Sequence, residues 1–134
     1  MDIPPPTPPG GISPYLTPSD ANAAADFYIK AFGAEELARM KAQDGKRLMH
    51  CHLRLNGASL MLSDGFPEHG HPALPPQAVV LHLQVEDIDA WWKRAVDAGA
   101  TVAMPVELMF WGDRYGQLKD PFGFMWSLGQ TPKA

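Results

Sequence analysis

The chain has 134 residues, which is enough for one compact domain and too short for two ordinary ones. Hydrophobic residues make up 46% of it, and 11 basic against 15 acidic residues give a net charge of −4. This acidic balance argues against nucleic acid or an anionic membrane surface as the main partner. The single cysteine, Cys51, excludes an intramolecular disulfide and is typical of a reducing compartment.

The N-terminal segment, residues 1–11, contains five prolines and few side chains that could pack in a core. We expect a flexible, proline-rich arm, and not a signal peptide, because the segment lacks a basic region followed by an apolar one. No apolar run in the sequence approaches the length that spans a bilayer, so a cytoplasmic location is expected.

Two helices are predicted from their terminal residues. Ser19 or Asp20 can cap a first helix that ends at Gly33. Asp87 can cap a second helix that ends at Gly99. Strands are expected at 12–17, 35–42, 46–55, 58–63, 79–85 and 101–103, with a break near Pro105 before a closing meander of three strands over 107–128. The predicted tight turns are Asp44-Gly45, Asn56-Gly57, Trp111-Gly112-Asp113 and Asp120-Pro121-Phe122-Gly123.

The second half of the sequence repeats the first. The two helix-ending glycines lie 66 residues apart and the two capping aspartates 67 apart. The repeating unit is βαβββ, which predicts an α+β fold of two tandem modules, about 12–64 and 78–129, within one domain, 12–134. A Pro- and Gly-rich connector, 65–77, joins them. Because one helix cannot cover both faces of a four-stranded sheet, we expect the modules to form a cupped mixed sheet.

Alternation along the strands assigns side chains to faces. One apolar set should pack under the helices, with Cys51 as a small buried residue. This set is Met49, Cys51, Leu53 and Leu55 in the third strand and Val79, Leu81, Leu83 and Val85 in the fifth. His50, His52 and His82 then point into the cup. His69 and His71 fall in the connector and are interpreted as exposed polar residues.

The segment WGDRYGQLKDPFGFMWSL resembles the C-terminal signature of the PhnB-like branch of the vicinal oxygen chelate superfamily. That superfamily includes glyoxalase I, bleomycin-resistance proteins and extradiol dioxygenases, and the resemblance extends over about 12–128. It implies two βαβββ modules in one cupped sheet and a homodimer. Phe124 departs from the branch, in which histidine is more common at that position.

The resemblance also places the four metal-ligand positions of metal-dependent members at Ser13, Met61, Val80 and Ser127. None of these side chains is a good ligand for a divalent ion, so neither a metal nor another cofactor is expected. Three readings of the cup-facing histidines stay open. They could line the cup as neutral polar groups, they could form a three-nitrogen zinc site, or one of them could act as a general base.

The aromatic turn near residue 111 has two readings. Trp111 and Tyr115 could stack on a planar ligand while Arg114 meets an anionic group. Alternatively, Trp111 packs at an interface and Asp113 pairs with Arg114 or caps the turn. The complete set of candidate ligand-binding residues is Tyr15, His50, His52, Met61, His82, Trp111, Arg114 and Tyr115.

These observations lead to three functional hypotheses. The first is a metal-free protein that binds a small organic molecule in a cupped cavity, as bleomycin-resistance proteins do. The second is a metal-dependent lyase, isomerase or dioxygenase of the same superfamily. The third is a non-catalytic dimeric module without a specific ligand.

Overall fold

The computed structural model describes residues 7–133, so the first six residues of the predicted arm lie outside it. Residues 7–11 have no regular secondary structure. The chain divides into two compact units. The first runs to Ile29 and resumes over Gly33–Leu74, and the second combines Lys30–Phe32 with the chain from Pro75 onward. None of the helices described in this range is long and apolar enough to cross a bilayer.

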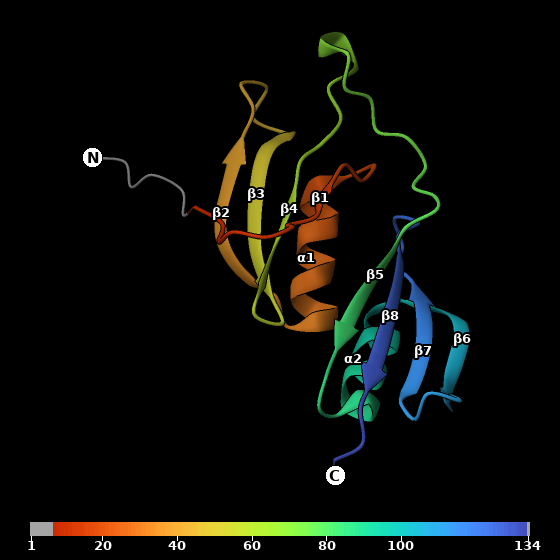
Figure 1. The fold of residues 1–134 in the computed structure, drawn as a ribbon. Coiled ribbons are helices and arrows are strands. Elements are labelled where there is room, and N and C mark those ends of the chain that lie inside the picture. Colours follow the sequence, from red (N-terminus) through yellow and green to blue (C-terminus); the bar gives the residue numbers. More distant parts are fainter. Residues whose placement is uncertain (1–6, 134) are drawn as a thin grey trace. The chain divides into compact units, whose positions relative to one another are not determined.

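The predicted fold of two tandem βαβββ modules is confirmed (Figure 1). The first module contains β1 (Tyr15–Leu16), α1 (Ala21–Phe32), β2 (Glu35–Lys41), β3 (Leu48–Leu55) and β4 (Ala58–Leu62), in the sheet order β1-β4-β3-β2. The second contains β5 (Val80–Gln84), α2 (Ile88–Ala98), β6 (Thr101–Leu108), β7 (Arg114–Lys119) and β8 (Met125–Gln130), in the order β5-β8-β7-β6. In each sheet only the first strand is parallel to its neighbour.

The helix ends follow the local signals in the sequence. Asp20 and Asp87 are the N-caps, and each side chain accepts a hydrogen bond from the backbone three residues on. Gly33 ends α1 in the left-handed conformation, at φ 70°. Gly99 ends α2.

The internal repeat is visible in the strand register. Tyr15 pairs with Met61 in the first sheet, and His82 pairs with Ser127 in the second. The helix starts are also held in the same way. The Asp64 carboxylate accepts from the Ala21 backbone N–H at 2.8 Å, and the Gln130 side chain accepts from the equivalent Ile88 N–H at 2.8 Å. In each module, therefore, a side chain at or just after the end of the last strand is hydrogen-bonded to the first backbone N–H of the helix.

One face assignment was wrong, because β3 contains an irregularity. Met40 pairs with His50, but the next residue of β2, Lys41, pairs with Leu48. The extra residue on β3 is Met49, and such a bulge reverses the alternation beyond it. Leu48 is therefore fully buried, whereas Met49 is 59% exposed. Cys51 is fully buried, as predicted.

Three strands also differ in extent from the predictions. The first strand is only Tyr15–Leu16, and β5 starts at Val80, which leaves Val79 66% exposed. The predicted break near Pro105 is also wrong, because β6 is continuous over Thr101–Leu108. This strand lies at the edge of its sheet, where a proline can be accommodated without losing a hydrogen bond between strands. The pairing of β6 with β7 also shifts register around Met104.

Candidate functional site

The first unit contains a cavity of about 780 Å³ at the end of its sheet. The β2–β3 hairpin forms one wall and the start of the connector forms another. Tyr15 of β1 and Ser63, directly after β4, contribute from between them. The lining residues are Tyr15, Ala42, Gln43, Asp44, Arg47, Met49, Ser63, Phe66, Glu68, His69 and His71.

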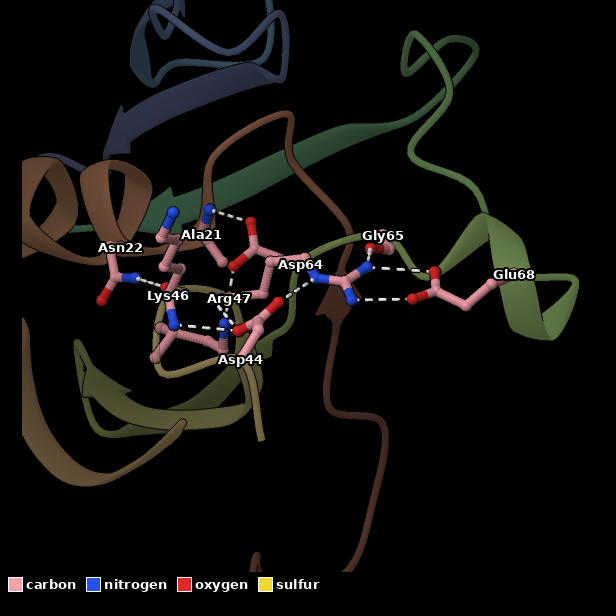
Figure 2. A network of polar contacts seen from close by, with 9 residues as sticks. Ala21, Asn22, Asp44, Lys46, Arg47, Asp64, Gly65 and Glu68 are labelled. Atoms are coloured by element: carbon pink, nitrogen blue, oxygen red, sulfur yellow. Dashed lines mark hydrogen bonds and ion pairs between the residues drawn. The ribbon is translucent and has the colours of Figure 1, made fainter. Parts of the chain in front are cut away.

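Arg47 links the two walls of this cavity (Figure 2). Its Nε donates to Asp44 in the hairpin turn at 2.7 Å. Its two terminal nitrogens donate to the two carboxylate oxygens of Glu68 in the connector, at 3.0 and 2.7 Å. The guanidinium also lies over the ring of Phe66, 4.4 Å from its centroid. One side chain thus fixes the connector against the hairpin.

Acid–base equilibria reflect the same contacts. The hydrogen bonds from Arg47 lower the pKa of Glu68 to about 2. The pKa of Asp44 also falls to about 2, first because the backbone N–H of Lys46 donates to it and second because Arg47 does. Both carboxyl groups are therefore charged at neutral pH, and the Arg47 contacts are lost only in strong acid.

The start of the connector, residues 65–71, forms a closed loop. Phe66 and His71 exchange backbone hydrogen bonds, and a turn of 3₁₀ helix, η1 (Pro67–His69), lies between them. Nε2 of His71 lies 3.1 Å from the Thr17 hydroxyl. His69 and His71 are exposed, as predicted, but both also line the cavity.

Tyr15 and His50 form a pair beside the cavity. The Tyr15 hydroxyl and His50 Nδ1 are 2.9 Å apart, and the rings are 5.7 Å apart at 30°. Burial raises the pKa of Tyr15, and burial followed by the nearby His52 lowers the pKa of His50. Both groups are therefore neutral at pH 7, and together they form a hydrogen-bonding unit without charge.

His52 is on the predicted face of β3 but is only 1% exposed. Its Nε2 lies 2.8 Å from the Ser59 hydroxyl, whereas its Nδ1 is buried and has no hydrogen-bond partner within residues 7–133. Met61 is its direct neighbour on β4. His52 is therefore a packed polar residue and not part of the cavity lining.

In the second unit, His82 has both ring nitrogens engaged. Nε2 lies 2.7 Å from the amide oxygen of Gln84, which can only accept, so Nε2 carries the proton. The amide nitrogen of Gln84 lies on the other side, 3.5 Å from a carboxylate oxygen of Asp113, which can only accept, and it also donates to the Thr131 hydroxyl at 2.7 Å. Nδ1 then accepts from the Ser127 hydroxyl at 2.7 Å. The lone pair that would bind a metal is already used.

Aromatic rings continue from His82 along the β6–β7 hairpin. Tyr115 stacks on His82 with 5.9 Å between centroids, and Trp111 contacts Tyr115 edge-on at 5.7 Å. Arg114 precedes Tyr115 on β7 and therefore points to the opposite face. There it makes two 2.9 Å bonds to Asp89 of α2, and not to Asp113. The structure thus groups three of the four candidates of this module and separates Arg114 from them.

Each module has one tyrosine and one histidine at equivalent positions of its first and third strands, with the two residue types exchanged between the modules. In the first, tyrosine is on the first strand and histidine on the third. In the second, His82 is on the first strand and Tyr115 on the third. The two pairs are equivalent in register. His50 lies two residues before the β3 residue that pairs with Met61, and Tyr115 lies two residues before the β7 residue that pairs with Ser127. The repeat therefore extends to polar groups outside the cores.

The residues at the four superfamily metal positions do not fit a divalent metal. Two hydroxyls, a thioether and an isopropyl group stand at Ser13, Met61, Val80 and Ser127. The Ser127 hydroxyl is also bonded to His82. In the described part of the chain, no three His, Cys, Asp or Glu side chains gather closely enough to hold a metal ion.

Most of the cavity lining was missed by sequence reasoning. Tyr15 was a candidate, but Arg47, Met49, Phe66 and Glu68 were not. Arg47 was expected in the strand 46–55 and Glu68 in the connector 65–77, and no functional role was predicted for either. Their contact joins positions 21 residues apart, and no local pattern encodes it.

Comparisons with known proteins agree with this fold. The chain is 49% identical over 125 residues to protein Mb0911c of Mycobacterium bovis, a match that covers 89% of this chain and 82% of that protein. TnmS3, an antibiotic binding protein from Streptomyces sp. CB03234, is 29% identical with a TM-score of 0.66, covering 90% of this chain and 93% of that one. The PhnB protein from Bacillus cereus is 20% identical with a TM-score of 0.71, covering 91% of this chain and 100% of that one.

A family model covers most of the chain as well. The model of the Glyoxalase/Bleomycin resistance protein/Dioxygenase superfamily matches residues 12–128. The match includes both βαβββ modules and the WGDRYG and DPFG motifs. The chain therefore belongs to the Glyoxalase/Bleomycin resistance protein/Dioxygenase superfamily.

Proposed function

We propose that this chain binds a small organic molecule in the cavity of its first module, without the metal site of metal-dependent relatives. The cavity itself carries the proposal. Its volume of about 780 Å³ suits a small ligand, and Tyr15, Met49 and Phe66 offer apolar surface beside a few polar groups. TnmS3 is an antibiotic binding protein of the same fold, which supports a binding role. A ligand panel screened by thermal shift tests it, because a ligand that binds the folded state raises the Tm.

Metal content separates this function from a metal-dependent lyase, isomerase or dioxygenase. A divalent site needs three or four converging His, Cys or carboxylate donors, and the four superfamily positions supply none. We expect well under one equivalent of zinc, nickel, iron or manganese per chain when protein purified without chelator is measured by elemental analysis. A stoichiometric metal that disappears in His50→Ala or His82→Ala would make the metal-dependent enzyme the leading hypothesis.

The Tyr15–His50 pair should contribute to affinity. His50 holds the hydroxyl of Tyr15, a lining residue, so His50→Ala should weaken binding of a panel ligand by about 1–2 kcal/mol, the scale of one hydrogen bond. Tyr15→Phe removes only the hydroxyl and should cause a similar loss, measured by calorimetry. Unchanged affinity in both variants would remove the pair from the site.

The chain should also form a homodimer. β6 is a sheet edge, and several apolar side chains near it are exposed, including Leu108 at 72% and Phe110 at 98%. Pairing two chains would cover this surface. Sedimentation at micromolar concentration should give the dimer mass, and Phe110→Glu should shift it toward monomer. A monomeric native protein would contradict this proposal.

A further inference from the structure

The charged groups of the cavity carry an inference about its ligand, which rests on the proposed function. Arg47 is the only Arg or Lys side chain among the described lining residues. It has five N–H donors, and four of them already have acceptors. These acceptors are Asp44, the Gly65 carbonyl and the two oxygens of Glu68. An anionic ligand that enters the cavity therefore meets a guanidinium whose paired donors are occupied.

The two carboxylates have different secondary contacts. Asp44 also accepts from the backbone N–H groups of Lys46 and Arg47, at 2.8 and 2.9 Å, so it stabilises the hairpin turn itself. Both Glu68 oxygens, by contrast, bond to the Arg47 guanidinium. Together the three charged side chains sum to −1, because one positive and two negative groups meet. Removing the Glu68 charge would leave the hairpin turn intact and bring the summed charge of these three side chains to zero.

We propose that Glu68 is a specificity-determining residue, which excludes anionic ligands by occupying the paired donors of Arg47. Guanidinium and carboxylate groups match as a two-bond fork, so a ligand carboxylate competes directly with Glu68 for the same two nitrogens. In the native cavity the Glu68 carboxylate, which is tethered to the chain, keeps these two nitrogens and excludes the ligand carboxylate. Neutral ligands avoid the competition and bind against Tyr15, Met49 and Phe66.

The test uses two probes of nearly equal shape, naphthalene-2-carboxamide and naphthalene-2-carboxylate, measured by calorimetry. The native protein should bind the carboxamide at least tenfold more tightly. In Glu68→Gln, carboxylate affinity should rise about tenfold or more relative to carboxamide affinity, and the gain should shrink with added salt. Glu35→Gln is the matched control, because it removes an equal charge from an exposed ion pair with Arg54 away from the cavity. It should change neither affinity.

The outcomes separate the inference from the function it rests on. If the carboxamide binds both proteins but Glu68→Gln gains no carboxylate affinity, the specificity role is wrong and the binding function stands. An equal gain of carboxylate affinity in Glu35→Gln would show that the effect comes from net charge alone, and would also overturn the specificity role of Glu68. If neither probe binds and neither perturbs the amide resonances of Ser63 and Phe66 at millimolar concentration, the binding function is overturned together with the inference.

Discussion

Replacing Asp64 with alanine is expected to lower the free energy of unfolding by roughly 2–6 kcal/mol, since each of two buried donors left without a partner costs about 1–3 kcal/mol. The Asp64 side chain is buried, and each oxygen accepts from a different element. Oδ1 bonds the first N–H of α1, at Ala21, and Oδ2 bonds the Leu48 N–H at 2.6 Å. The residue thus joins helix, hairpin and last strand next to the cavity (Figure 2). Urea unfolding followed by circular dichroism measures the loss.

Asp20→Ala is the control for this prediction. Asp20 caps the same helix, but it is exposed and its side chain accepts one backbone hydrogen bond, from the Ala23 N–H at 3.0 Å, so the loss of that side chain should cost about 0.5–2 kcal/mol. Asp64→Asn keeps one acceptor oxygen and should fall between native protein and Asp64→Ala. If Asp64→Ala costs no more than Asp20→Ala, the two buried bonds do not hold the module together.

The elements that sequence reasoning predicted are those with local signals. Caps and glycine stops fixed both helices, because the residues that satisfy a helix end lie within a few positions of it. The Asn56-Gly57 turn was predicted for the same reason, and both residues have positive φ, 51° and 82°. The repeat of these signals 66 or 67 residues later was enough to predict two βαβββ modules.

The errors arose where distant partners decide the structure. The bulge at Met49 depends on how β3 pairs with β2, and alternation alone placed that side chain on the wrong face. Pro105 is tolerated because β6 is an edge strand, which only the sheet order reveals. Pairing of Arg47 with Glu68, which links the two walls of the cavity, is likewise set by tertiary structure. His50 lies on the opposite face of β3 from the buried Cys51, as alternation predicted, but its bond to Tyr15 joins residues 35 apart.

Replacing Gly116 with alanine is expected to destabilise the second module by about 1–3 kcal/mol, the usual cost of adding a methyl group to a packed core. Gly116 lies on β7, on the face that packs against α2. A Cβ there would lie 2.7 and 2.8 Å from ring carbons of Trp92 and 3.0 Å from a methyl group of Val106. These distances are shorter than carbon–carbon contacts allow, so the tryptophan ring or the helix must move. Thermal and urea unfolding measure the change.

Sterics alone should cause this loss, because the backbone at Gly116 does not have positive φ and any residue can adopt its conformation. Gly10→Ala is the matched control, since its added Cβ would meet nothing within 4 Å and its φ is not positive. A second variant isolates the contact. Trp92→Leu shortens the side chain, so Gly116→Ala should cost clearly less in that background than in the native one. Equal losses in both backgrounds would show that Trp92 is not the reason for glycine at this position.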